Sequence, residues 1–183
     1  SEVHMLRTLD NPETAKGRNI GMMGWTKFPE NRLDQMVRAL VEEGPVAVAV
    51  AAGPDWNYYR RGIMLPSGCD TNFVISHAVV LYGFGGIGKR KFWRLKNSWG
   101  RDWGEHGHLR LSRLDHEEAY CGWDSEPEVG SGCKGGPSKV WACGSCGLLY
   151  DAAVPHFLPY GSKEAEQSRM MRVPSVGVVS RRV

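Results

Sequence analysis

The stretch that decides the fold runs from residue 97 to residue 110 and reads NSWGRDWGEHGHLR. Its closely spaced glycines are typical of tight turns, because glycine accepts backbone conformations that other residues avoid. A strand-like run precedes it at 91–97, and another follows at 107–112. We therefore predict two neighbouring strands joined by a glycine-rich connection.

The chain before this stretch adds one helix and further strands. Between residues 30 and 43, apolar side chains recur every three or four positions, which predicts an amphipathic helix that Gly44-Pro45 ends. The pattern as a whole predicts an α+β fold, in which an antiparallel sheet curls into a barrel beside a short helix. Apolar runs predict the other strands at 20–28, 46–52 and 77–83.

The motifs along the chain resemble those of the papain-like cysteine peptidases. Residues 97–110 match the family's N-S-W-G-x-x-W-G-E-x-G-Y-x-R pattern, except that His108 stands where a tyrosine is usual. Residues 44–48 resemble its GPVxV strand, and residues 76–79 resemble its [ND]-H-A-V segment. These matches occur in the family's order along the chain, from about residue 20 to residue 155.

The resemblance covers the second, barrel-like half of the family's fold. It implies a papain-like right-hand half-domain, which completes its cleft with a mostly helical half that bears the nucleophilic cysteine. Residues 113–145 interrupt the pattern as a cysteine-containing insertion, which we expect to be cross-linked or functional. The predicted segments are a lead-in at 1–17, the half-domain at 18–155 and a basic, flexible tail at 156–183.

The resemblance implies roles for four residues of the active site. His77 resembles the general acid/base, which holds the nucleophilic thiolate as an ion pair and protonates the leaving amine. Asn97 resembles the residue whose side-chain carbonyl accepts the other ring N–H and orients the imidazole. Trp99 would cover that hydrogen bond and keep water from competing for it. Ser76 stands where the family most often has Asn or Asp, and it retains a hydrogen-bonding side chain.

The nucleophile itself does not fall where the family places it. Cys143-Gly144-Ser145-Cys146 superficially matches the family's C-G-[SA]-C nucleophile signature, but it follows both His77 and Asn97. In the family the nucleophile lies near the mature N-terminus, about 130 to 150 residues before the histidine and asparagine. His77 has only 76 residues ahead of it. The resemblance therefore places the nucleophile, and the oxyanion-hole glutamine near it, outside this chain.

The five cysteines require an explanation by covalent chemistry or metal binding. Composition leaves two alternatives open: disulfides in an oxidising compartment, or a zinc site that uses the C-x-x-C of Cys143 and Cys146. The resemblance pairs Cys146 with Cys69, just ahead of the predicted catalytic histidine. The remaining cysteines, which would form one disulfide and leave one odd thiol, are Cys121, Cys133 and Cys143.

Three further residues resemble the lining of the family's main specificity pocket. Ala49 and Ala78 resemble its small wall residues, and Asp151 resembles the residue at its floor. Two small walls above an acid would admit a long or basic side chain of a peptide substrate. The alternative for Asp151 is an exposed aspartate in a turn, where this residue type is common.

Composition argues against several classes of function. The formal net charge of +3 comes mainly from the segment after residue 156, and we see no basic stripe on the folded part, so we expect no nucleic-acid partner. No apolar run approaches the roughly 18 to 20 residues that cross a bilayer, so we expect no membrane partner. No cofactor is expected. The chain begins at Ser1 without a signal-peptide pattern, which indicates a processed product or a fragment.

The sequence therefore predicts part of a cysteine peptidase that hydrolyses peptide bonds. Its partner would be the half that carries the nucleophile, as a separate chain or an upstream segment, and alone it should be inactive. Disulfides point to the secretory pathway, a lysosome or vacuole, or the outside of the cell. Two alternatives stay open: an inactive, peptidase-derived binding or structural module, and a zinc-binding module at 121–146.

Overall fold

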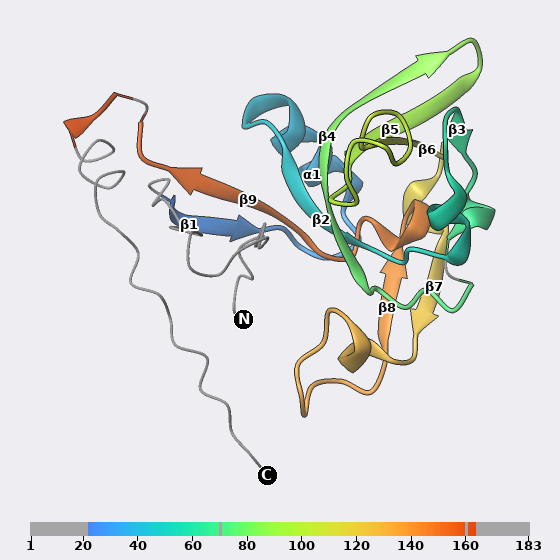
Figure 1. Ribbon diagram of the computed structural model, residues 1–183. Helices are drawn as coiled ribbons and strands as arrows, with labels where there is room; N and C mark the ends of the chain where they lie inside the picture. The colour runs from blue at the N-terminus through green and yellow to red at the C-terminus, as the bar shows by residue number, and fades with distance from the viewer. Residues whose placement is uncertain (1–21, 70, 160, 164–183) are drawn as a thin grey trace, which may run out of the picture. The chain divides into compact units, whose positions relative to one another are not determined.

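The computed structural model describes residues 22–69, 71–159 and 161–163 (Figure 1). The expected lead-in at 1–17 and most of the expected tail at 156–183, namely residue 160 and residues 164–183, lie outside the described residues. The assignment of these two segments therefore stays a prediction.

Two compact units make up the chain. One unit is Trp25–Val154, and the other combines residues 1–24 and 155–183. Every residue that the sequence predicts for the active site, the pocket or the disulfide falls in Trp25–Val154. The candidate site therefore lies within a single unit.

The main sheet has seven strands in the spatial order β1-β9-β2-β4-β5-β6-β3. Strands β2, β4, β5 and β6 pair with their neighbours in antiparallel register, whereas β3 lies parallel to β6. The expected barrel does not close, because β1 and β3 remain as edges and β3 has only two residues. The strands are β1 Met22–Lys27, β2 Val46–Val50, β3 Ile63–Met64, β4 His77–Ile87, β5 Arg90–Lys96, β6 His108–Ser112 and β9 Ala152–Phe157.

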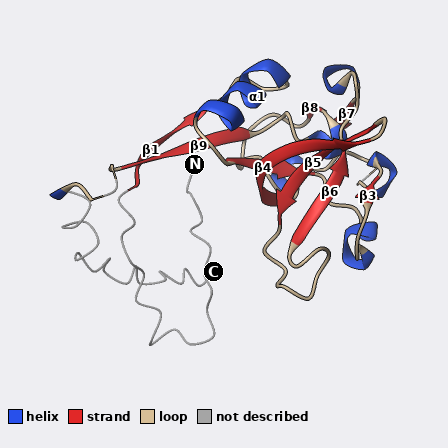
Figure 2. Cartoon of the chain, turned by 90° about the horizontal axis from the view of Figure 1, so that it is seen from above, coloured by secondary structure: helices blue, strands red, loops and turns tan. Residues whose placement is uncertain are grey.

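Helix α1 (Leu33–Glu42) lies to one side of the sheet (Figure 2). Its buried residues Met36, Ala39 and Leu40 recur at the three- and four-residue spacing that predicted an amphipathic helix at 30–43. That helix is confirmed, but it begins later than expected because residues 30 and 31 form a turn, with Asn31 at φ 60°. None of the helices in the described part of the chain is long and apolar enough to span a membrane.

The connection between β5 and β6 explains why residues 97–110 have the sequence they have. Trp103 is buried, and its ring N–H donates to the Trp56 carbonyl oxygen at 2.7 Å. Gly104 has φ +57°, and a Cβ at this position would lie 2.6 Å from the His108 carbonyl oxygen. Only glycine fits at position 104. The sequence Trp103-Gly104 thus places a buried side chain directly before a turn that needs glycine.

The insertion at 113–145 has a structure of its own. Strands β7 (Cys121–Asp124) and β8 (Val140–Cys143) form a second, antiparallel two-stranded sheet. A disulfide between Cys121 and Cys143 joins the strands at a paired position. The insertion is thus cross-linked, which is one of the two explanations expected for an insertion of this length. The short 3₁₀ turns of the chain are η1 Pro54–Tyr58, η2 Pro66–Gly68, η3 Glu117–Ala119, η4 Pro127–Val129 and η5 Ser145–Gly147.

Glu117 joins the insertion to the main sheet through a fully buried carboxylate. The Trp93 ring N–H donates to its Oε1 at 2.8 Å, and the Leu114 backbone N–H donates to the same atom at 2.9 Å. Both the backbone N–H and the hydroxyl of Ser145 also donate to this carboxylate. A buried charge is costly unless it is hydrogen-bonded, and these four donors compensate for the lost water.

Replacing Glu117 by Gln should destabilise the fold by about 2 to 3 kcal/mol, because the new amide nitrogen would face N–H donors instead of accepting from them. Urea unfolding with both disulfides intact measures the change. The control is Asp115→Asn, since the Asp115 side chain is exposed and forms an ion pair with the exposed Lys91. That variant should leave the free energy of unfolding nearly unchanged. Equal effects of the two substitutions would contradict the role given to Glu117.

Candidate active site

His77 and Asn97 come together because the strands that carry them are antiparallel neighbours. His77 is the first residue of β4, and Asn97 directly follows the last residue of β5. The Nε2 atom of His77 and the Oδ1 atom of Asn97 lie 2.8 Å apart. The two residues that the sequence predicts as catalytic are therefore hydrogen-bonded to each other.

The tautomer of the imidazole follows from the other partner of the Asn97 amide. The Ser98 backbone N–H donates to Asn97 Oδ1 at 2.8 Å, which identifies this atom as the oxygen. An amide oxygen only accepts, so His77 Nε2 carries the hydrogen and donates it. In the neutral ring, Nδ1 is then the nitrogen that can take up a proton.

Two tryptophan rings contact the His77 ring, and a third packs against both of them. The Trp99 ring lies 5.1 Å from the His77 ring, centroid to centroid, and the Trp56 ring meets the imidazole edge-on at 6.0 Å. Trp103 stacks on Trp56 at 6.3 Å and meets Trp99 at 5.3 Å. Asn97 is buried, whereas Trp99 is 40% exposed. That Trp99 shields the bond between His77 and Asn97 from water stays a prediction.

Sequence reasoning missed Trp56. Residues 55–59 predict only a short turn or a single helical turn, and the structure has the 3₁₀ turn η1 at Pro54–Tyr58. No pattern within that segment distinguishes a tryptophan that contacts His77 from one that fills the core. Trp56 lies three residues before Tyr59, and residues 59–63 resemble the family's Y-x-x-G-I segment, which is a signal that could have indicated it.

The predicted pocket residues also lie together. Ala49 and Ala78 face each other in the register of β2 and β4, one position beyond the pair of Val50 and His77. The Ala49 backbone N–H donates to the Asp151 carbonyl oxygen at 2.9 Å. Ala49 thus has Ala78 on one side and Asp151 on the other, which brings the three predicted pocket residues next to one another.

The Asp151 carboxylate has a cation beside it. Its Oδ1 lies 3.4 Å from the Nζ of Lys27, and both side chains are partly exposed, at 37% and 51%. Lys27 also approaches Glu30 at 3.8 Å. A basic side chain that reached Asp151 would therefore compete with Lys27 for the carboxylate, a point that the sequence did not indicate.

The disulfide expected between Cys69 and Cys146 is present in the structure. Cys146 is fully buried, and the Ala51 backbone N–H donates to its carbonyl oxygen at 2.8 Å. Cys69 pairs with Ala52 through an isolated bridge. The bond thus fastens the C-terminal segment beside β2 and beside the loop that leads to His77.

The other cysteines bear on the zinc alternative. Cys121 and Cys143 form the second disulfide, and Cys133 is a free, exposed thiol. The described residues contain no group of three or more His, Cys, Asp or Glu side chains that could hold a metal ion. Four of the five cysteines are thus used in disulfides, which argues against zinc held by the C-x-x-C pair.

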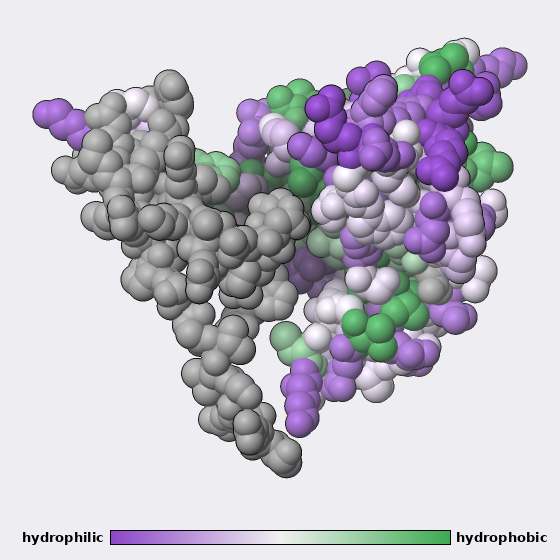
Figure 3. Space-filling model, viewed as in Figure 1, coloured by the Kyte–Doolittle hydropathy of each residue, from purple (hydrophilic) through white to green (hydrophobic). Residues whose placement is uncertain are grey.

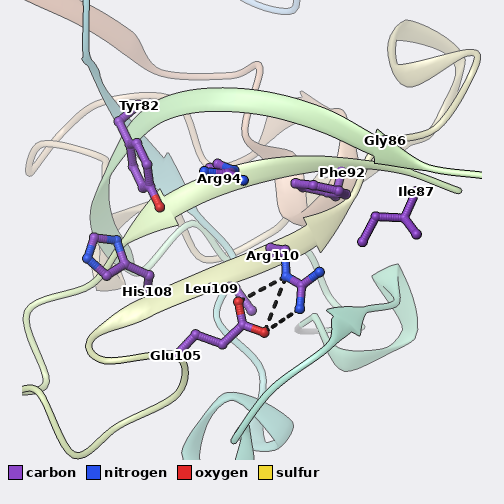
Figure 4. A pocket seen from close by; sticks show the side chains of 9 residues that line it. All are labelled: Tyr82, Gly86, Ile87, Phe92, Arg94, Glu105, His108, Leu109 and Arg110. Atoms are coloured by element: carbon purple, nitrogen blue, oxygen red, sulfur yellow. Dashed lines mark hydrogen bonds and ion pairs between the residues drawn. The ribbon is translucent and has the colours of Figure 1, made fainter.

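A cavity of about 420 Å³ is lined by residues of β4, β5, β6 and the connection before β6, and neither His77 nor Asn97 is among them (Figure 4). Inside it the Arg110 guanidinium donates to both oxygens of Glu105, and this hydrogen bonding lowers the pKa of that carboxyl. Because the pKa is lower in the folded chain than in the unfolded chain, the pair stabilises the fold at neutral pH and loses this effect in acid. The lining residues are Tyr82, Gly86, Ile87, Phe92, Arg94, Glu105, His108, Leu109 and Arg110.

The same region carries a basic surface outside the expected tail. Lys89 lies in the connection of β4 to β5, and Arg90 and Lys91 are the first two residues of β5. Hydrophilic residues are coloured purple in Figure 3 and cover much of the face that it shows. Lys91 is paired with Asp115. The expectation that the folded part is nearly neutral thus holds for its total charge, but the charge is concentrated locally at this turn.

Comparison with known proteins relates this chain to one family. A model described as papain family cysteine protease matches residues 9–131. Cathepsin K of Gallus gallus is 36% identical over 98 residues, which cover 53% of this chain and 29% of cathepsin K. Vignain of Ricinus communis is 36% identical over 106 residues, which cover 56% of this chain and 28% of vignain. The chain thus spans less than a third of the length of either relative.

Comparison with solved structures points to the same family. The bromelain protease from Ananas comosus, in complex with the E64 inhibitor, has a TM-score of 0.55 and 26% identity, over 75% of this chain and 51% of that chain. The cysteine protease CMS1MS2 of Carica candamarcensis, in complex with E-64, has a TM-score of 0.53 and 28% identity, over 79% and 54%. The match of the family model extends over more than half of the sequence and includes the strands that carry His77 and Asn97. The chain therefore belongs to the papain family of cysteine proteases.

Proposed function

We propose that this chain supplies the general acid/base and the orienting amide of a cysteine peptidase whose nucleophile lies outside it. The observation that carries the proposal is the 2.8 Å hydrogen bond from His77 to Asn97, with the amide oxygen held in place by Ser98. A structural histidine needs no such arrangement. Here the ring is oriented so that Nδ1 can serve a second group.

The chemistry begins when a cysteine thiol placed at His77 Nδ1 gives its proton to the ring. The resulting thiolate attacks the carbonyl carbon of a peptide bond, and the protonated His77 then gives that proton to the leaving amine. The acyl group is left as a thioester on the cysteine. His77 next takes a proton from water, which attacks the thioester, releases the acid and restores the thiolate.

The surrounding residues support each of these steps. Asn97 accepts from the imidazolium through Nε2 and thereby keeps the ring from rotating away from the thiolate. The tryptophan rings lower the local polarity, which strengthens the attraction between thiolate and imidazolium. No step requires a metal or a cofactor.

The nucleophile is proposed to come from a second polypeptide or an upstream segment. All four disulfide-bonded cysteines are unavailable as thiolates, and the one free thiol, Cys133, is exposed in the insertion. The same observation favours the second candidate, a catalytically inactive peptidase-derived binding or structural module. Both disulfides fit an oxidising compartment, such as the secretory pathway, a lysosome or vacuole, or the outside of the cell.

Experiments on protein purified from its natural source distinguish the peptidase proposal from the inactive binding or structural module. We expect the intact mass, measured before and after reduction, to reveal a second polypeptide or a longer form of this chain. An epoxide inhibitor of the E-64 type should label one cysteine in that added part, because only a thiolate activated by a histidine reacts readily. A chain that purifies alone and unlabelled would remove the peptidase proposal and leave the binding module.

In the complete peptidase, His77→Ala should lower kcat by about 10³-fold or more, since it removes the acid/base. Asn97→Ala should lower kcat by about 10- to 100-fold, because the ring is present but no longer oriented. Peptide hydrolysis at saturating substrate measures both. The control is His116→Ala, which removes an exposed histidine of the insertion and should leave kcat unchanged. Full activity of the His77 variant would refute the assignment.

The pocket is proposed to prefer basic side chains, with Lys27 as an internal competitor for Asp151. Asp151→Asn should lower the ratio of kcat/KM for basic over apolar side chains by about tenfold, which corresponds to about 1.4 kcal/mol. Lys27→Ala should raise the same ratio, because it frees the carboxylate. A matched series of peptides that differ only at this side chain gives both ratios. Shifts in the same direction would rule out the competition.

A further inference from the structure

The insertion at 113–145 contacts the chain just ahead of His77. Residues 71–76 are the loop that enters β4, and among the described residues they belong to no helix or strand. A backbone hydrogen bond joins this loop to the main sheet, from the Ser76 N–H to the Val50 carbonyl oxygen at 3.2 Å. Phe73 has a positive φ of 53°, which only a fixed surrounding keeps in place. The loop therefore needs support from elsewhere.

Asp124 supplies that support from the end of β7. Its side chain is fully buried, and its Oδ2 accepts the Ile75 backbone N–H at 3.0 Å. Its Oδ1 accepts the backbone N–H of Glu126 at 2.8 Å. One carboxylate thus joins the insertion's own turn to a residue two positions before His77, and both of its oxygens are used.

Direct packing reinforces this link. Gly130 lies so close to the loop that a Cβ there would overlap the Ile75 carbonyl oxygen and lie 2.6 Å from the Ser76 Cα. The Ile75 side chain is buried in a small cluster with Ala142 of β8 and Ala51. The insertion therefore contributes directly to the surroundings of this side chain, through Ala142.

We propose that the insertion is a positioning element for His77, and that Asp124 is the residue through which it acts. Asp124 holds the backbone at Ile75 and Ser76, which sets the start of β4 and with it the distance from the imidazole to Asn97. The inference rests on the proposed function in one respect, since the position of His77 affects catalysis only if His77 is catalytic. The contacts themselves do not depend on that function.

The hydrogen bond of the His77 ring gives a readout that needs no activity. In the chain as it stands, we expect an NMR signal for the Nε2 hydrogen that exchanges slowly with water, because it is bonded and covered. Asp124→Asn should speed this exchange at least about tenfold, or remove the signal, since an amide cannot accept from both N–H groups.

Glu117→Gln is the matched control for Asp124→Asn. Both carboxylates are fully buried, both belong to the insertion and both accept from backbone N–H groups, but Glu117 has no bond to residues 71–77. The control should lower stability without changing the exchange of the His77 ring hydrogen. If the two variants change that exchange equally, or neither does, the positioning role is wrong.

Two further measurements apply where Asp124→Asn does not fold. Gly130→Ala adds a methyl group that would collide with the backbone of Ile75 and Ser76, so it should speed exchange of the His77 ring hydrogen. Val129→Ala changes the exposed neighbouring residue and should leave that exchange unchanged. In the unaltered chain, the Ile75 amide should be protected from exchange by its bond to Asp124. An Ile75 amide that exchanges as fast as an exposed one would overturn the proposal without any substitution.

Activity of the complete peptidase then tests the consequence for catalysis. Asp124→Asn should lower kcat by about 10- to 100-fold with little change in KM, as expected when a catalytic group is misplaced but the substrate still binds. An altered ring signal with unchanged kcat would mean that the insertion positions His77 while the proposed function of His77 is wrong. An unchanged ring signal and an unchanged kcat would refute the positioning role itself.

Discussion

The hydrogen bond between His77 and Asn97 is possible only because β4 begins beside the point where β5 ends. An antiparallel pair brings the start of one strand to the end of the other, so two residues 20 positions apart meet at one edge of the sheet. Everything else at the site depends on this register. A slip of either strand by one residue would turn its side chain to the opposite face. Trp103 and the Glu105–Arg110 pair stabilise the connection of β5 to β6, which follows Asn97 directly.

The insertion is fastened to this framework by two buried carboxylates, Glu117 and Asp124. Neither has a cation beside it in the described structure, and each is stabilised by backbone N–H groups or by a ring N–H. Such bonds are directional, so they fix the position of the partner backbone as well as stabilise it. Glu117 reaches Trp93 of β5, and Asp124 reaches Ile75 ahead of β4. The insertion therefore contacts β5, which Asn97 follows, and the loop that leads into β4 and His77.

The sequence predicted the parts of the site that a continuous motif contains. His77, Asn97 and Trp99 lie in such motifs, and helix α1 and the main strands follow from the spacing of apolar residues. The open edge of the sheet, the ring of Trp56 beside His77 and the two buried carboxylates were not predicted. Each depends on a partner far along the chain: Ser145 is 28 residues from Glu117, and Asp124 is 49 residues from Ile75. From the sequence alone, charged residues such as Glu117 and Asp124 are expected on the solvated surface, and only the fold shows that both are buried.

The loop ahead of His77 is fixed at both of its ends by segments that come much later in the sequence. Cys69 is bonded to Cys146, which lies 77 residues away, and Ile75 is bonded to Asp124. Both contacts join segments that are far apart in the sequence. The loop that leads to His77 is therefore held by the C-terminal segment and by the insertion together. A papain-family site is usually considered as a cysteine and a histidine on two halves of the fold; in this chain the histidine half is itself assembled from three separate segments, and the insertion is one of them.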